Sequence, residues 1–303
     1  MLILKAQTKW RWIIAGYLFL AGLGAGAYIT GVVAGFLGDE WAQLSKIGVA
    51  LGFPCVAVGC GLLIFDLGRP LNFWRAAMRP NTSWMARGTI IISTFMVLGA
   101  IHIAFWIWPF GGLSAGARAV IGMLGIVFAF STMVYTGILL GAARPIAFWS
   151  TALLPVLFFI SAASTGVMAV ILTASLMGVP HSGAITTLAR ADIILLILEV
   201  FAVAMYFQAT HRVPEGRESA RLVLRGQVAP LFWLGFALLG LVIPLALEVV
   251  GVFALHDGGA ATAAIVASIS GIIGGLILRQ VVLSGGIHAP LRAGRFEFGL
   301  PII

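Results

Sequence analysis

The chain is a series of long apolar blocks separated by short polar segments. Eight blocks approach or exceed the roughly 20 residues that a helix needs to cross a bilayer, and they occupy residues 12–37, 45–65, 85–109, 117–141, 151–177, 190–209, 228–255 and 260–283. The alternation of apolar and polar residues that marks a membrane β-barrel is absent. The pattern therefore predicts an all-α membrane protein with eight transmembrane helices, and the connections between them are too short for a separate soluble domain.

Composition agrees with a protein whose solvent is lipid. Hydrophobic residues make up 61% of the 303 positions and charged residues only 9%, whereas a soluble domain has roughly 25% charged residues. This excludes a soluble enzyme and a disordered chain. The net charge of +8 reflects few acidic residues, 10 against 18 basic ones, so we expect no nucleic-acid partner.

The basic residues are concentrated at one end of the predicted helices. Eight spans place both termini on one side, together with the loops 66–87, 142–150 and 210–227, and all but three of the 18 basic residues lie there; the exceptions are Lys46, Arg118 and Arg190. We call this side the basic end. The positive-inside rule predicts a multi-pass protein of the inner (cytoplasmic) membrane with cytoplasmic termini.

The sequence shows no ligand set for a metal or haem. Cys55 and Cys60 are five residues apart in one span and form no iron–sulfur or zinc motif, and no pair of histidines faces across two spans. We expect no haem or iron–sulfur cluster in this chain. His102 is more simply interpreted as a hydrogen-bonded core residue than as a proton carrier. A redox role would then need an electron carrier from a neighbouring subunit.

Four charged residues lie inside the later spans, where ionisable groups are costly and suggest function. Asp192 and Glu199 are seven residues apart on one face of the sixth span, Glu248 is in the seventh and Arg279 in the eighth. Two interpretations remain open. These residues form a path for protons or ions, or a buried Glu199–Arg279 ion pair fixes the packing of the helices.

A second polar group lies at the basic end of the first four spans. Tyr17, Asp66, Arg69 and Tyr135 come from three spans at similar depth. Each tyrosine alone is consistent with the aromatic belt of a membrane protein. A phenol hydroxyl together with a carboxylate, however, suits the head of a quinone. The hydroxyl hydrogen-bonds a quinone carbonyl, and the carboxylate exchanges protons.

Two further patterns concern packing. The motif R-P-x-x-F-W occurs at 69–74 and again at 144–149. It is either a repeated anchor in the headgroup layer or packing around a ligand mouth or a docked partner, and the first interpretation is the simpler one. The first span contains Gly22-x-x-x-Gly26 and Gly31-x-x-x-Gly35, which predicts close crossing with other helices.

Several segments resemble the NrfD/PsrC family, the membrane subunits of polysulfide-reductase-like complexes. The resemblance rests on D-L-G-R-P at 66–70 with the following S-W-M-A-R-G at 83–88, on Y-L-F-L-A-G-L-G-A-G at 17–26, and on Y-T-G-I-L-L at 135–140. It extends over essentially the whole chain.

The resemblance implies an eight-helix subunit without a prosthetic group that binds a quinone, menaquinone or ubiquinone, in its first four-helix bundle. It also implies electron exchange with a ferredoxin-like iron–sulfur subunit, which serves a molybdopterin-type catalytic subunit with molybdenum or tungsten. The position of Tyr135 contacts quinone in such families, and those of Tyr17 and Asp66 are implicated. Asp192, Glu199 and Arg279 match positions implicated in proton handling.

We therefore expect two bundles, residues 1–150 with a quinone pocket and residues 151–303 with a proton path. The function expected is that of a quinone-reactive membrane anchor in a respiratory oxidoreductase. The alternative, suggested by the intramembrane carboxylates, is an ion or solute transporter, which inverted repeats with broken helices would favour. The R-P-x-x-F-W repeat is not inverted.

Overall fold

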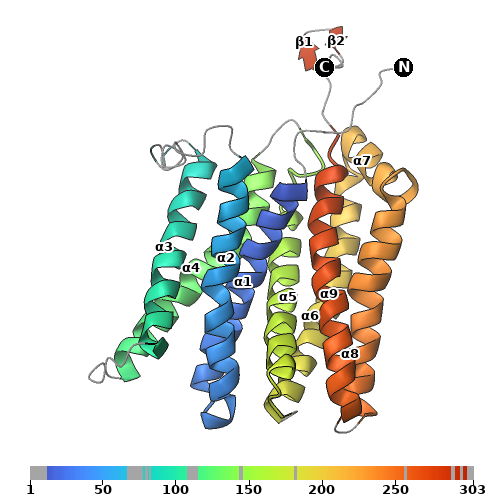
Figure 1. Ribbon diagram of the computed structural model, residues 1–303. Coiled ribbons are helices and arrows are strands. Elements are labelled where there is room, and N and C mark those ends of the chain that lie inside the picture. The colour runs from blue at the N-terminus through green and yellow to red at the C-terminus, as the bar shows by residue number, and fades with distance from the viewer. Residues whose placement is uncertain are drawn as a thin grey trace.

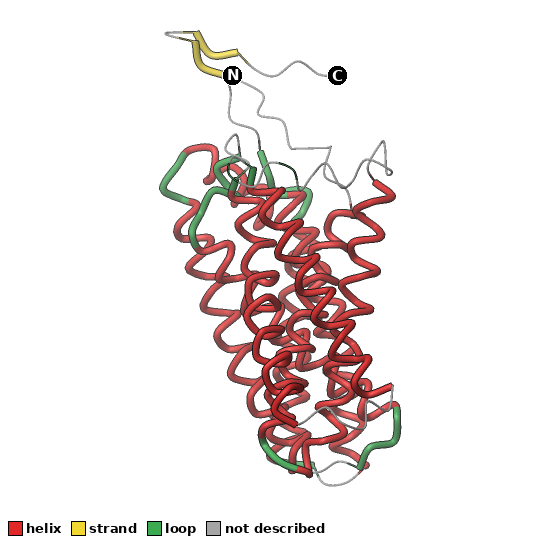
Figure 2. Tube along the Cα trace, turned by 90° about the vertical axis from the view of Figure 1, so that its left-hand side faces the viewer, coloured by secondary structure: helices red, strands yellow, loops and turns green. Residues whose placement is uncertain are grey.

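The computed structural model describes residues 12–66, 78, 81, 83–107, 115–142, 146–180, 183–255 and 258–287, and two short strands beyond them. The described part is a bundle of long helices, as the apolar blocks predict (Figure 1). Figure 2 shows that the helices run along one common direction and that the connections lie at the two ends of the bundle. The strands β1 (Leu291–Ala293) and β2 (Phe296–Phe298) pair antiparallel near the C-terminus.

The helices agree with the predicted blocks to within a few residues, with one exception. Their bounds are α1 Trp12–Phe36, η1 Asp39–Trp41, α2 Ala42–Asp66, α3 Trp84–Ile107, α4 Ala115–Gly141, α5 Leu153–Leu176, α6 Gly183–Thr210, α7 Pro214–Arg225, the π-helical η3 Leu231–Val242, α8 Ile243–Phe253 and α9 Gly258–Ser284. The exception is α6, which begins seven residues before the block predicted at 190–209. Ala184, Ile185 and Leu188 of this extra segment are buried in a cluster with residues of α1, α2 and α5, so packing extends the helix beyond its most apolar stretch.

Seven segments are long and apolar enough to cross a membrane: the helices α1 to α5, the continuous pair η3 and α8, and α9. The remaining long helix, α6, has 28 residues and carries Arg190, Asp192 and Glu199. It runs the height of the bundle (Figure 1) and packs against α5 and α8. The predicted seventh span is thus built from a π-helix followed by an α-helix.

The helices α1 and α5 lie at the centre of the bundle. About 72% of the apolar core of α1 and 67% of that of α5 are buried inside the protein, against 28% for α3. The helix α1 packs against α2, α4, α5 and α9, and α5 packs in turn against α4, α6 and α9. The two predicted halves therefore meet along α1 and α5, and the division at residue 150 stays a prediction.

Glycines of α1 allow these contacts, as the small-residue pattern predicts. A side chain at Gly26 would overlap the backbone of Ala162 in α5, and one at Gly31 would come within 2.6–2.8 Å of the backbone of Gly48 and Val49 in α2. The same helix thereby approaches two neighbours at backbone distance, on different sides of its own axis.

The anchor interpretation of the R-P-x-x-F-W motif is wrong for the part of the second copy that the structure describes. Phe148 and Trp149 are buried inside the protein, so their side chains are covered by other helices and are not available to lipid headgroups. The Trp149 Nε1–H donates to the carbonyl of Val282 at 2.8 Å, and the Tyr206 hydroxyl donates to the carbonyl of Phe148 at 2.6 Å. The motif therefore joins the α4–α5 connection to α6 and α9. The first copy, 69–74, lies outside the described residues.

Candidate functional site

Two of the predicted quinone-site residues, Tyr17 and Tyr135, come together in the structure. Tyr17 lies in the second turn of α1 and Tyr135 lies near the end of α4, so both are near the end of the bundle where α7 lies (Figure 1). Both side chains are buried. Their phenol groups are close enough to interact electrostatically, and Cys60 of α2 is near the Tyr17 hydroxyl as well.

Gly88 of α3 provides the space for Tyr135. A Cβ at position 88 would overlap the Tyr135 ring, including its hydroxyl oxygen. Ser83 sets the start of this helix, since its carbonyl accepts from the N–H of Arg87 at 3.2 Å and its hydroxyl lies 3.4 Å from the N–H of Ala86. The segment 83–88 thus begins α3 and places a glycine against the tyrosine ring.

The residues after Tyr135 attach this part of α4 to its surroundings. The Thr136 hydroxyl donates to the carbonyl of Met133 at 2.7 Å and so is satisfied within its own helix. A side chain at Gly137 would overlap the backbone of Pro155 at the start of α5. In the Y-T-G sequence, Tyr135 supplies a hydroxyl and Gly137 allows a close contact between α4 and α5. This contact fixes the position of the Tyr135 hydroxyl.

The other two predicted quinone-site residues are not placed. The helix α2 ends at Asp66, but its side chain is outside the described part of the protein, and so is the whole of Arg69. The structure thus joins Tyr17 with Tyr135 and leaves the roles of Asp66 and Arg69 as predictions.

All four predicted intramembrane charges are buried, and they lie in one part of the later helices. Arg279 of α9 is held by three hydrogen bonds, from its Nη1 to the Ser161 hydroxyl at 2.5 Å and to the carbonyl of Gly275 at 2.9 Å, and from its Nη2 to the carbonyl of Phe158 at 3.4 Å. The guanidinium carbon also lies 5.3 Å from the centre of the Phe158 ring. The cation therefore connects α9 to α5.

Glu199 lies beside the same serine and interacts electrostatically with Arg279. Among the described residues, the one pair of oppositely charged groups within 4.0 Å is Arg221–Glu218 on α7. The sequence left open a direct ion pair between Glu199 and Arg279. Their charged groups are not within 4.0 Å of each other, so the prediction of a direct pair is wrong. Ser161 lies between the two charges: its hydroxyl accepts from Arg279 and faces Glu199 as a donor.

Asp192 and Glu248 form a second carboxylate pair on α6 and α8. Their carboxyl groups are within mutual interaction range, and Ser164 of α5 lies close to Asp192. Both oxygens of Asp192 and one of Glu248 are nevertheless buried without a hydrogen bond of normal geometry to another described residue. Buried carboxylate oxygens are rarely left in this way, and such groups indicate function, water or an ion.

The two groups are arranged as steps along α6. Asp192 and Glu199 are seven residues apart, which is about 10 Å along a helix. Glu199 forms one group with Ser161 and Arg279, nearer the end where α6 joins α7. Asp192 forms the other group with Glu248 and Ser164. Carboxylates and hydroxyls at this spacing can pass a proton through one or two intervening waters.

Three residues of these groups were missed by sequence reasoning. Ser161 and Ser164 are three residues apart and so share one face of α5, and this spacing is a signal that could have identified them. Gly88 ends the S-W-M-A-R-G motif at 83–88, but its role is defined only by the tyrosine that packs on it. Within the described residues, no group of three or more His, Cys, Asp or Glu side chains is arranged to hold a metal ion.

Several known proteins are similar in sequence to this chain. A family profile described as "Polysulphide reductase, NrfD" matches residues 4–290. A component of the polysulfide reductase of Wolinella succinogenes is 33% identical over an alignment of 266 residues, gaps included, which covers 79% of this protein and 83% of that one. Protein NrfD of Escherichia coli strain K12 is 27% identical over 91% of this protein and 94% of its own length. A subunit of the sulfite dehydrogenase of Allochromatium vinosum is 30% identical over about half of each sequence, 49% and 50%.

A match over nearly the whole length, together with the bundle of membrane helices, confirms the resemblance seen in the motifs at 17–26, 66–88 and 135–140. The chain belongs to the polysulphide reductase, NrfD family of membrane proteins.

Proposed function

We propose that this chain is the quinone-reactive membrane subunit of a multi-subunit oxidoreductase. Quinone or quinol, menaquinone or ubiquinone, reacts beside Tyr17 and Tyr135, with Asp66 and Arg69 completing the pocket. Two electrons pass between the quinone and a ferredoxin-like iron–sulfur subunit, and the catalytic reaction takes place in a molybdopterin-type subunit beyond it. Relatives named as parts of polysulfide reductase and sulfite dehydrogenase support an assembly of this kind.

The observation that carries this proposal is the buried pair Tyr17 and Tyr135, of which Tyr135 packs against Gly88. A neutral ring with two carbonyl oxygens needs hydrogen-bond donors in an apolar surrounding and no fixed charge. Two phenol hydroxyls from different helices meet this need, and Gly88 gives the room in which the Tyr135 ring lies. Reduction of a quinone also takes up two protons, which a carboxylate at the position of Asp66 would deliver from the end of the membrane.

The test is quinone-linked turnover of the purified complex carrying Tyr135→Phe. We expect a loss of roughly tenfold or more, because a transition-state hydrogen bond is removed while the shape of the side chain is kept. Turnover of the catalytic subunit with a soluble dye, which bypasses the membrane protein, should not change. Tyr206→Phe is the matched control, since its hydroxyl also is buried but donates to the carbonyl of Phe148. Full quinone-linked turnover in Tyr135→Phe would refute the role.

We further propose that α6 is the eighth membrane span and that protons move along it during turnover. Its height in the bundle and its packing on α5 and α8 support a spanning helix, and the even number of spans agrees with α1 beginning at the end where α9 finishes. The predicted orientation in the inner membrane, with this basic end in the cytoplasm, follows from the arginines. A reporter that is active only in the periplasm, fused after Ile303, would overturn it by being active.

The proton proposal has its own variant, Glu199→Gln. We expect it to lower coupled turnover about fivefold or more while quinone binding stays within about twofold, because the amide keeps the size of the carboxyl group but cannot carry a proton. Equal loss of binding and turnover would indicate misfolding and count against the proton path.

The alternative function, an ion or solute transporter, rests on the pair Asp192–Glu248 with its unbonded oxygens. Liposomes with the isolated protein decide between the two functions. Uptake driven by a gradient in the absence of a redox partner would favour transport. Ion movement that occurs only during quinone turnover would favour the oxidoreductase subunit.

A further inference from the structure

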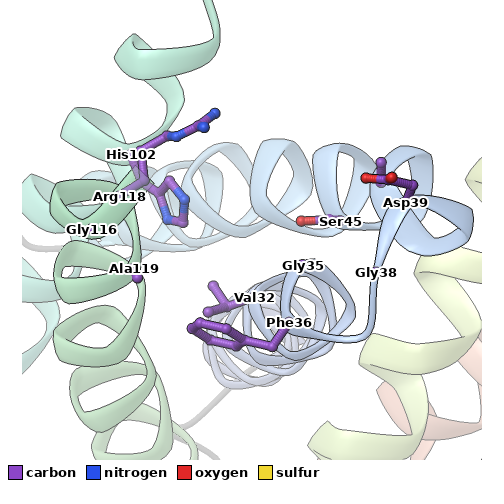
Figure 3. A pocket seen from close by; sticks show the side chains of 11 residues that line it. Val32, Gly35, Phe36, Gly38, Asp39, Ser45, His102, Gly116, Arg118 and Ala119 are labelled. Atoms are coloured by element: carbon purple, nitrogen blue, oxygen red, sulfur yellow. The ribbon is translucent and has the colours of Figure 1, made fainter. Parts of the chain in front are cut away.

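A cavity of about 570 Å³ lies at the end of the first four helices that is remote from Tyr17 and Tyr135. Figure 3 shows it between the end of α1, the start of α2, the end of α3 and the start of α4. Its walls are mainly glycine and apolar side chains, among them Val32, Phe36 and Ala119. Pockets of this size, mostly apolar with a few convergent polar groups, are typical ligand sites.

The polar groups of the cavity include a built hydrogen-bonded pair. The His102 ring lies at the cavity wall (Figure 3), and its Nδ1 is 2.8 Å from the hydroxyl of Tyr28, a side chain that is completely buried. The Tyr28 ring contacts Phe95 edge to face with centroids 5.2 Å apart. The pair thus has one end at the cavity and the other in the core of the bundle.

The tyrosine of this pair is seated in the same way as Tyr135. A side chain at Gly125 of α4 would overlap the Tyr28 hydroxyl and ring, just as one at Gly88 of α3 would overlap Tyr135. A side chain at Gly122, one turn earlier, would lie 3.0 Å from Val32 and 3.4 Å from the His102 ring. Each end of the first four helices therefore has a buried tyrosine fitted against a glycine of a neighbouring helix.

The charges of the cavity favour a neutral ligand. Among the described residues, its lining carries one cation, Arg118, and one acid, Asp39, so these residues give it no net charge with His102 neutral. A phosphate or a carboxylate would add an uncompensated negative charge. The outer surface beside the cavity is apolar, with Val33, Phe36 and Val120 exposed, which suits a ligand that reaches the cavity from the lipid and keeps an apolar tail there.

We propose that this cavity, with the Tyr28–His102 pair at its wall, is a second binding site for the head of a quinone. His102 hydrogen-bonds one oxygen of the ring, and Val32, Phe36 and Ala119 cover the ring faces. The inference rests on the proposed function for the chemical class of the ligand, but the site is a different one, at the opposite end of α1. Quinone binds at this site without electron transfer. The site lies at the membrane surface opposite to Tyr17 and Tyr135, where quinone can exchange with the lipid.

The experiment is photolabelling of the purified complex with an azido-naphthoquinone, with the labelled peptides identified by mass spectrometry and competed with excess menadione. We expect two competed sites, one near Tyr17 and Tyr135 and one on the segments around Phe36 and Ala119. Ala119→Trp, which fills the cavity, should reduce the second label roughly tenfold or more and leave the first unchanged. Val120→Trp is the matched control, because this neighbouring side chain is 53% exposed and does not line the cavity; it should change neither label.

The outcomes separate the two proposals. Competed label near Tyr135 alone, or label near Phe36 that Ala119→Trp leaves in place, overturns the second site while the proposed function stands. Competed label near Phe36 alone, lost in Ala119→Trp, supports the second site and contradicts the first. A phospholipid found in native mass spectra of the wild-type complex and absent from Ala119→Trp, without competed label there, assigns the cavity to lipid and overturns the proposal.

Discussion

The first four helices bring together tyrosines and glycines, whereas the later helices bring together carboxylates and an arginine. In the early region, the hydroxyls of Tyr17 and Tyr135 lie between closely packed helices, and the space for one ring exists because position 88 has no side chain. In the later region, Arg279 is anchored by three hydrogen bonds, while Asp192 and Glu248 retain unbonded oxygens.

The difference shows that one membrane bundle contains two chemically different surroundings. A neutral flat molecule needs a shaped, uncharged space with a few donors, and packing alone can supply it. A proton or ion needs charged or ionisable groups, which must be shielded from lipid by the protein itself. The two central helices belong one to each region, since α1 carries Tyr17 and α5 carries Ser161 and Ser164.

The largest effect is expected where the two regions meet. Gly166 of α5 lies against the backbone of Gly26 in α1, so Gly166→Val places a branched side chain into backbone with no room to move. We expect a loss of more than about 3 kcal/mol of stability and little folded protein in size-exclusion chromatography. Gly61→Val is the control, since a side chain there meets nothing within 4 Å. Equal thermal stability of the two variants would show that α1 and α5 are not closely packed.

A smaller effect is expected in the charged region. Arg279→Leu removes a buried cation with three hydrogen bonds and leaves Ser161 and Glu199 without it, which should cost about 2–3 kcal/mol. The unfolding midpoint in detergent measures this cost. Arg221→Leu removes a cation whose side chain is 72% exposed beside Glu218 and should cost well under about 1 kcal/mol, as exposed pairs usually do. Similar midpoints for the two variants would contradict a structural role for Arg279.

The next prediction concerns the aromatic region alone. Gly88→Ala pushes a methyl group into the Tyr135 ring, so we expect quinone-linked turnover to fall about tenfold, a change of about 1.4 kcal/mol in transition-state stabilisation. Protons moved per electron should not change, because the carboxylates lie elsewhere. Gly99→Ala on the same helix meets Phe53 at an ordinary 3.4 Å and should retain full turnover. Equal losses in both variants would mean that α3 tolerates no substitution and that position 88 is not special.

The smallest effect is expected at a single hydroxyl. Ser164→Ala removes the group beside Asp192, and we expect about 0.5–1.5 kcal/mol of destabilisation with a slower coupled turnover. Ser131→Ala on α4 removes a hydroxyl that donates to Val127 of its own helix at 2.7 Å, away from the carboxylates, and should leave turnover unchanged. Loss of turnover in both variants would remove the distinction between the two serines.

Much of the fold follows from the sequence because the bilayer imposes a simple length requirement. The apolar blocks predicted the helices to within a few residues, and the charged residues Asp192, Glu199, Glu248 and Arg279 were identified as buried simply because they interrupt such blocks. The start of α6 was missed, since packing of Ala184 and Ile185 extends it into a more polar stretch. Phe148 and Trp149 were misplaced because the same aromatic residues suit a membrane surface and a protein core.

The sequence by itself determined that the protein is a bundle of membrane helices, which family it belongs to and which polar residues lie within the apolar blocks. These properties depend on local composition and spacing. Only the tertiary structure decided that Ser161 stands between Glu199 and Arg279, that Gly88 holds the Tyr135 ring, and that Tyr28 and His102 meet at a cavity on the remote end. Each of these is a contact between different helices, and for Tyr135 and Tyr28 a glycine of the neighbouring helix leaves the space for the ring.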